Sequence, residues 1–191
     1  MNPLVSFYDR GAASLDAAAP VLLPTLSRLL FAGVLLGYFW ASGLTKFEGL
    51  FTPSTGAYAQ IFPRLFEAVG YDATQLGPWP KLVVIAGAYG EMILPLLVVA
   101  GLLTRAAALG MIGFILVQSV TDIIGHGADV TTVGTWFDRI PDAMILDQRA
   151  LWLLPLIVLV AMGSGPFSVD RVLRGLRKNQ PKPLGQRPLS L

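Results

Sequence analysis

Long apolar runs dominate the chain, and four of them are long enough to cross a membrane as helices. Such a helix needs about 20 mainly apolar residues. The runs cover residues 26–46, 82–103, 106–124 and 147–163. Four buried helices of a soluble protein are the alternative, but isolated core helices are usually shorter. We predict an all-α, integral membrane four-helix bundle that forms a single domain over residues 1–175.

Details of these runs predict how the helices end and pack. The Thr104–Arg105 link is so short that the second and third helices must form an antiparallel hairpin. The fourth run is long enough only if it begins near Asp147, with Arg149 reaching outward to the interface. Gly33 and Gly37 have the spacing that lets two helix backbones approach closely, although ordinary glycine usage in membrane helices gives the same spacing.

Shorter amphipathic stretches lie outside the spans. Apolar residues recur at helical spacing in Tyr58–Val69, where Pro63 suits a first helical position, and Trp136–Ile140 suggests a second short helix. Ser168 is a candidate N-cap for a basic amphipathic helix, which we expect to lie against the anionic inner leaflet. Its apolar stripe and membrane setting argue against nucleic acid as a partner. Residues 176–191 are expected to form a basic, disordered cytoplasmic tail.

Lys and Arg gather on one side of the predicted membrane. Arg10 and Arg28 precede the body of the first span, and Arg105 lies in the short link. The C-terminal segment is also basic, whereas the connections 47–81 and 121–149 are mixed or acidic. Because cytoplasmic loops carry the excess of Lys and Arg, both termini are expected in the cytoplasm. We predict a multi-pass protein of the bacterial inner (plasma) membrane, embedded in the lipid bilayer.

The composition agrees with a membrane location and excludes several cofactors. Charged residues make up 14% of the chain, against about 25% in a typical soluble protein. The chain has no cysteine and one histidine, His126, which excludes iron–sulfur clusters, zinc–thiolate sites and bis-histidine haem. A redox role would therefore need a diffusible cofactor or a partner. Met1–Ala19 lacks a basic stretch followed by an apolar core, so we expect no cleavable signal peptide.

Glu91 is the most informative residue for chemistry, because it lies near the middle of the second span. A bare charge there costs at least about 2.5–3.5 kcal/mol, so it must be neutralised, paired or exposed to a water-filled cavity. Lys46 is the natural partner, although direct contact requires helices of unequal depth and Lys46 can equally be an interface anchor. Arg64 or Arg139, folded in from a long connection, would be the substitutes. Glu91 is a candidate for relaying protons or binding a ligand head group. A structural pair that fixes helix register is the alternative.

Aromatic residues in the spans are candidates for lining a pocket with Glu91. The set is Tyr38, Trp40, Tyr89 and Trp152, and ordinary packing is the alternative for each. Gly87 and Pro95, one turn from Glu91, loosen the helix and leave room for a ligand. A quinone ring would suit such a site, since it needs apolar walls and a few polar donors.

A metal site is not expected. Asp122 and His126 are four residues apart and share a face if the third helix continues, with Asp129 as a doubtful third ligand. Two adequate ligands are too few for a metal site, so a solvated helix end is favoured. We also find no nucleophile–base motif, phosphate-binding loop or dinucleotide fingerprint in the sequence.

Four short motifs occur in the order typical of one family. They are Gly43–Phe47 at the end of the first span, Gly90–Glu91 in the second, Gly101–Arg105 at the tight turn, and Gly165–Asp170 after the fourth span. The chain resembles the DoxX family of small bacterial four-helix membrane proteins. The resemblance implies a plasma-membrane protein, and some relatives look like subunits of thiosulfate:quinone oxidoreductases or associate with redox-stress or metal-handling systems. It supplies no catalytic residues to map onto this sequence.

Together these features predict a DoxX-like membrane subunit of a redox-linked complex that interacts with quinone and a redox partner protein. Such a chain would be at most a subunit of an oxidoreductase without a tightly bound cofactor of its own. The alternatives are a transporter of a small solute or metal complex that uses Glu91, and a scaffold that recruits a soluble partner. The sequence does not set the substrate or the oligomeric state.

Overall fold

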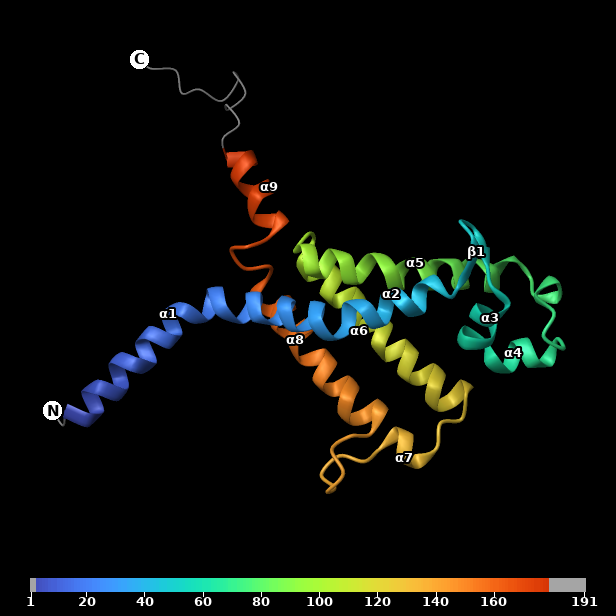
Figure 1. Ribbon diagram of the computed structural model, residues 1–191, viewed down its shortest axis with the longest axis horizontal. Coiled ribbons are helices and arrows are strands. Elements are labelled where there is room, and N and C mark those ends of the chain that lie inside the picture. The colour runs from blue at the N-terminus through green and yellow to red at the C-terminus, as the bar shows by residue number, and fades with distance from the viewer. Residues whose placement is uncertain (1–2, 179–191) are drawn as a thin grey trace, which may run out of the picture.

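The computed structural model describes residues 3–178, and helices make up most of this part of the chain (Figure 1). Within it, four helices are long and apolar enough to span a membrane, namely Pro3–Leu44, Pro78–Ala100, Thr104–Gly125 and Met144–Met162. The prediction of an all-α membrane bundle is confirmed. In chain order the elements are α1 (Pro3–Phe31), η1 (Ala32–Leu36), α2 (Gly37–Leu44), β1 (Phe47–Gly49), β2 (Thr52–Pro53), α3 (Thr55–Ile61), α4 (Pro63–Ala68), η2 (Ala73–Gln75), α5 (Pro78–Ala100), α6 (Thr104–Val120), η3 (Thr121–Gly125), α7 (Val130–Val133), η4 (Met144–Gln148), α8 (Arg149–Met162) and α9 (Val169–Lys178).

The four long helices pack in a ring around an apolar core. α2 contacts α5, α5 contacts α6, α6 contacts α8, and α8 contacts α1. Phe31, Phe39 and Met111 are among the fully buried side chains of this core. Large apolar side chains also cover the outside of the ring, for example Leu116 at 52% exposure and Leu154 at 59%. An apolar outer surface on a packed bundle is what a lipid environment requires.

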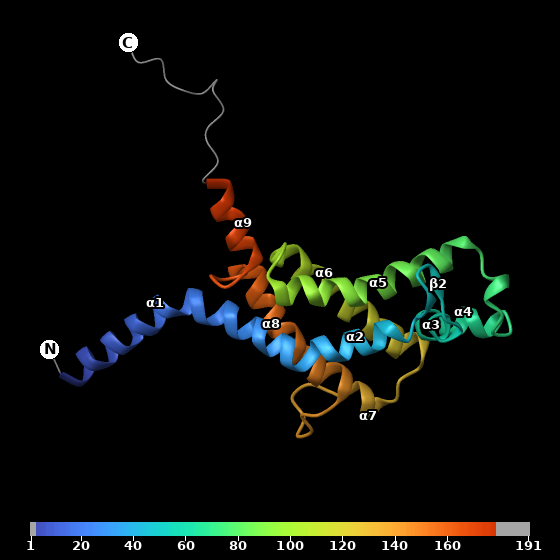
Figure 2. The same cartoon turned by 45° about the horizontal axis from the view of Figure 1, so that its top comes forward.

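The first helix is longer than the sequence pattern indicated. We predicted a span from about residue 26, whereas the continuous helix begins at Pro3 and runs for 42 residues. At about 1.5 Å per residue it is roughly twice as long as the hydrocarbon core is thick. Its first half extends away from the bundle (Figures 1 and 2). This half contains the charged residues Asp9, Arg10 and Asp16, so its sequence does not predict a membrane span. The charged residues do not interrupt the helix.

A partly buried ion pair that the sequence did not predict lies beside the π-helical turns η3 and η4. Arg149 follows η4 and is 8% exposed, and it pairs with Asp122 of η3. Arg149 Nη1 also donates a hydrogen bond to Ser119 Oγ (2.9 Å). The expectation that Arg149 reaches outward is therefore wrong, because a partner on the neighbouring helix compensates the cost of burying its charge. Single π turns of this kind are frequent at functional sites.

The two long connections confirm one predicted helix start and correct the other predicted short helix. Pro63 is the first residue of α4, as predicted, but the expected single helix is two short helices, α3 and α4, divided at Phe62. Trp136–Ile140 is not helical, and the helix of that connection is instead α7, which Asp129 caps. Gly134 ends α7 at a φ of 79°, which L side chains rarely adopt, so the helix cannot continue into the Trp136 segment. Trp136 Nε1 donates a hydrogen bond to the Leu146 carbonyl (3.0 Å).

The opposite end of the bundle holds the tight turn and α9. The turn occupies residues 101–103, so Thr104 and Arg105 already belong to α6. Ser168 Oγ accepts a hydrogen bond from the Arg171 backbone amide (3.2 Å), which confirms Ser168 as the cap of α9. This helix continues to Lys178, beyond the expected domain end at residue 175. Of the predicted disordered tail 176–191, residues 179–191 lie outside the described residues.

Glycine positions distinguish close helix contacts from open faces. A Cβ atom at Gly33 or Gly37 would meet no atom within 4 Å, so these two residues do not mediate helix contact within the described residues. A Cβ at Gly43 would lie 2.6 Å from Met92 Cγ. Gly43, and not the predicted pair, therefore allows α2 to approach α5 closely.

Candidate functional site

A cavity of about 500 Å³ lies between α2, α3, α5, α6 and η3. Its volume falls within the usual range for small-molecule sites. Apolar residues and glycines form much of the wall, including Ile61, Leu94 and Phe114. The polar or ionisable side chains that line it are Ser42, Lys46, Gln60, Glu91, Gln118, Thr121, Asp122 and His126.

Lys46 and Glu91 form an ion pair in the wall of this cavity. Lys46 Nζ lies 2.6 Å from Glu91 Oε2, and the two residues are 5% and 2% exposed. Lys46 Nζ also donates to Ser42 Oγ (2.8 Å) and to the Ser42 carbonyl (3.4 Å). Two of the three N–H groups of the ammonium therefore have close partners, whereas the contact to the Ser42 carbonyl is long for a hydrogen bond. Among the arrangements that the sequence left open for Glu91, the structure has the direct pair with Lys46.

Helices of unequal depth make this contact. The first span ends at Leu44, and Lys46 follows it in the turn, whereas α5 extends outward past Glu91 for 13 more residues to Pro78. The β2 strand and α3 pack against α5. Trp40 Nε1 donates to the Met92 carbonyl (3.0 Å), which ties α2 to α5 beside the pair. These contacts set the depth of Lys46 relative to Glu91.

Four glycines leave the space that the cavity occupies. They are Gly87 and Gly90 of α5 and Gly110 and Gly113 of α6. A Cβ at Gly113 would meet nothing within 4 Å, and one at Gly90 would meet only a Leu94 methyl at 4.0 Å. Both helices thus carry two glycines three residues apart, which places them on one helix face. This repeated spacing is a signal that could have located the cavity from the sequence.

Gln118 is a site residue that the sequence did not indicate. Its Nε2 donates to the Tyr38 hydroxyl (3.1 Å). Its Oε1 is buried and has no hydrogen-bond partner among the described residues. A buried polar atom without a partner is costly, and it often marks a place where a ligand or water binds.

The predicted aromatic residues do not line the cavity. Tyr38 reaches it only through Gln118, and its ring packs against Trp152 with centroids 5.3 Å apart. Tyr89 donates from its hydroxyl to the Leu50 carbonyl (2.6 Å), and Trp40 bonds to the α5 backbone. The structure therefore brings Lys46 and Glu91 together in the cavity wall and places the predicted aromatic residues outside the cavity.

The weak metal candidates are separated by other partners. Asp122 pairs with Arg149, and His126 Nε2 donates to the Gln60 carbonyl (3.0 Å). Asp129 caps α7, where hydrogen bonds from the Thr131 side chain and from Thr132 strongly lower its pKa. Across residues 3–178 no three His, Cys, Asp or Glu side chains gather closely enough to hold a metal ion.

One family comparison identifies the chain. The DoxX family model matches residues 23–122, which is more than half of the chain and includes both Lys46 and Glu91. Comparisons with curated proteins and with solved structures found no match. The matched region contains α2, α5 and α6, the three long helices that enclose the cavity. The chain belongs to the DoxX family of small membrane proteins.

Proposed function

We propose that this DoxX-family protein is the membrane subunit of a redox-linked complex and that its cavity binds the head group of a lipid-soluble quinone. The observation that carries the proposal is the buried Lys46–Glu91 pair in the wall of an otherwise largely apolar cavity. Apolar walls with a few convergent polar groups are typical of small-molecule sites. A lipid-soluble ligand could enter from the bilayer.

The polar groups suit both forms of such a head group. Quinone carbonyls accept hydrogen bonds, and Lys46 Nζ is a donor at the cavity wall. Quinol hydroxyls donate, and the buried Gln118 Oε1 is an acceptor without a partner among the described residues. The Glu91 carboxylate is a second acceptor in the same wall. The bound quinone would supply the redox chemistry, and the electrons would come from a partner protein.

Purification from bacterial membranes in mild detergent tests the proposal. We expect wild-type protein to retain quinone that organic solvent extracts and chromatography identifies. Gly90→Leu should lose it, because a side chain there enters the cavity, whereas Gly37→Leu on an open helix face should retain it. Equal quinone content in all three proteins would contradict the proposal. Proton-coupled solute uptake by liposomes that Glu91→Gln abolishes would instead make the protein a transporter.

A further inference from the structure

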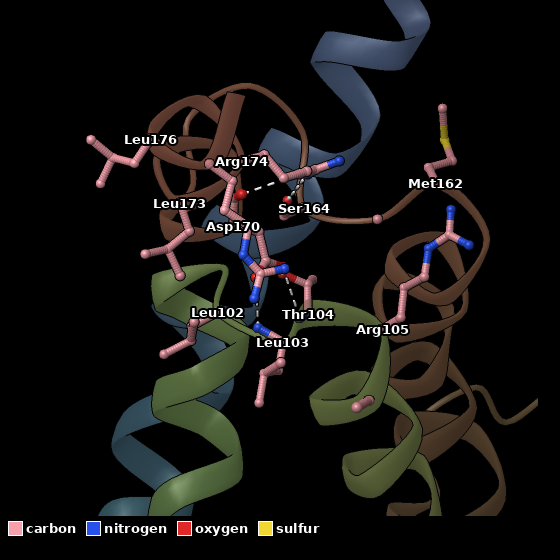
Figure 3. A pocket seen from close by; sticks show the side chains of 13 residues that line it. Leu102, Leu103, Thr104, Arg105, Met162, Ser164, Asp170, Leu173, Arg174 and Leu176 are labelled. Atoms are coloured by element: carbon pink, nitrogen blue, oxygen red, sulfur yellow. Dashed lines mark hydrogen bonds between the residues drawn. The ribbon is translucent and has the colours of Figure 1, made fainter. Parts of the chain in front are cut away.

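A second cavity, of about 760 Å³, lies at the basic end of the bundle (Figure 3). It is bounded by the α5–α6 turn, the end of α8 and one face of α9. Figure 3 shows Arg105 and Met162 on one side and Leu173 and Leu176 of α9 on the other. This cavity is separate from the Lys46–Glu91 site.

Hydrogen bonds fix α9 at the rim of this cavity. Asp170 accepts bonds from the backbone amides of Leu103 (2.8 Å) and Thr104 (3.1 Å), and from Thr104 Oγ1 (2.9 Å). The Asp170 amide in turn donates to the Gly101 carbonyl (2.9 Å). Both carboxylate oxygens are therefore directed at the start of α6. The acidic charge in the cavity wall is thus stabilised by the helix terminus that it caps.

The remaining charges of the cavity are basic. Arg105, Arg174 and Arg177 line it, with Asp170 as the acid among the lining residues. Arg174 donates hydrogen bonds to the Asp170 carbonyl (3.1 Å) and to Ser164 Oγ (3.5 Å). Arg105 Nη2 donates to the Ala161 carbonyl (3.2 Å), which leaves other N–H groups of this exposed guanidinium for a ligand. Guanidinium groups pair with phosphate through two parallel hydrogen bonds.

The depth of the cavity matches the lipid head groups. The spanning segments Thr104–Gly125 and Met144–Met162 both have an end at this cavity. Both views show α9 running across the direction of α5 (Figures 1 and 2). A helix in that orientation lies along the membrane surface. Its leucines remain exposed, Leu173 by 46% and Leu176 by 61%, beside the basic groups. Exposed apolar side chains next to a basic cavity match the two parts of an anionic lipid.

We propose that this cavity binds the phosphate head group of an anionic phospholipid, with Arg105 and Arg177 contacting the phosphate and the α9 leucines contacting the acyl chains. This site is independent of the proposed quinone site. Lipid bound there would hold α9 against the ends of α6 and α8.

Native mass spectrometry of the full-length protein in detergent tests the site with added phosphatidylglycerol. We expect the double variant Arg105→Gln/Arg177→Gln to bind this lipid on the order of tenfold more weakly, which is the loss of one strong charged contact. The control Arg10→Gln/Arg171→Gln removes the same number of positive charges from the N-terminal and C-terminal helices, at positions outside the cavity. It should stay within about twofold of wild type.

Three outcomes would overturn the lipid site. Equal losses in the two double variants would mean that the attraction is diffuse. Equal binding of phosphatidylglycerol and phosphatidylcholine by wild type would remove the role of the arginines in recognising negative charge. Displacement of the lipid by inorganic phosphate would assign the cavity to a soluble phosphate compound. Unchanged thermal unfolding of Arg105→Gln/Arg177→Gln would show that any loss of binding is not a loss of fold.

Discussion

The Lys46–Glu91 pair places two opposite charges within the bundle, where each alone would be costly. The two charged groups lie 2.6 Å apart and are both buried. Each charge therefore provides most of the compensation for the cost of burying the other. A buried pair adds little stability compared with apolar residues of similar size, but removing one partner leaves the other charge uncompensated. Retaining such a pair beside a cavity is expected where the charges contact a ligand or a proton.

We expect Lys46→Met to destabilise the protein by about 3–5 kcal/mol, because Glu91 is then buried without a cation. The double variant Lys46→Met/Glu91→Leu should recover most of this loss, since it removes both charges. Glu91→Gln should fold, whereas Glu91→Lys should impair insertion or stability by placing two cations together. Thermal unfolding in detergent measures all four. A double variant as unstable as Lys46→Met would contradict the role assigned to the pair.

At the scale of elements, the family motifs meet in two groups. The Gly43–Phe47 motif contacts the Gly90–Glu91 motif through the Lys46–Glu91 pair. At the other end, the Gly101–Arg105 turn contacts the Gly165–Asp170 motif through the carboxylate of Asp170. Arg28 completes this second group by donating to the Val98 and Ser164 carbonyls, both at 3.2 Å. The motifs therefore hold the helix ends together at both ends of the bundle.

Asp170 makes the second group sensitive to acid. Burial alone would raise its pKa, but hydrogen bonds from Thr104 and Leu103 and the charge of Arg174 lower it overall. A carboxyl with a lowered pKa in the folded state stabilises the protein at neutral pH. That contribution is complete above the ordinary pKa of 3.8 and is lost as the pH falls through the lowered value.

We therefore expect Asp170→Ala to cost about 1 kcal/mol at neutral pH, as the loss of a helix cap usually does. The difference from wild type should stay constant down to about pH 4 and shrink below it. Thermal unfolding across this pH range measures the effect. Asp170→Asn is the control, because its amide oxygen still accepts a bond but does not titrate in this range. A difference that persists unchanged in acid would contradict the assignment.

The fold was largely predictable at this scale, and the site only in part. The length of the apolar runs is a local property, so the presence of four spanning helices, the first residue of α4 and the cap of α9 followed from the sequence, whereas the start of the first helix did not. The Asp122–Arg149 pair joins residues that are distant in the chain, and no periodicity reports such a contact. Glu91 drew attention because a charge in a span is costly, and the glycine pairs of α5 and α6 have a recognisable spacing. Gln118 has no such local signal. The aromatic residues were predicted to line the cavity and do not, because most aromatic side chains at this depth pack against neighbouring helices.

At the scale of the whole molecule, the two ends of the bundle differ in charge and structure. Figure 1 shows α9 at one end and α3 and α4 at the other. Arg105 follows the α5–α6 turn at the α9 end, and Arg28 bonds to Val98 and Ser164 there, whereas Lys46 lies just before β1 at the α3 end. The positive-inside rule assigns the Arg105 end to the cytoplasm. We propose this orientation, with both termini inside, in the bacterial inner membrane.

Single-cysteine labelling tests the orientation cleanly, because the natural chain has no cysteine. In intact spheroplasts, a membrane-impermeant maleimide should label Thr74→Cys in the outer connection. Ser6→Cys and Gly175→Cys should react only after the membrane is permeabilised. Labelling of Gly175→Cys in intact spheroplasts would reverse the orientation, and labelling of only one of the two terminal positions would contradict an even number of spans.

The most direct test of the proposed function is a titration of purified protein in detergent with a short-chain quinone, followed by isothermal calorimetry. We expect wild type and the lipid-facing control Gly37→Leu to show saturable binding of one quinone per chain. Gly113→Leu, whose side chain would enter the cavity without a backbone clash, should bind at least about tenfold more weakly. Identical titration curves for all three proteins, or quinone binding that never saturates, would contradict a quinone site beside the Lys46–Glu91 pair.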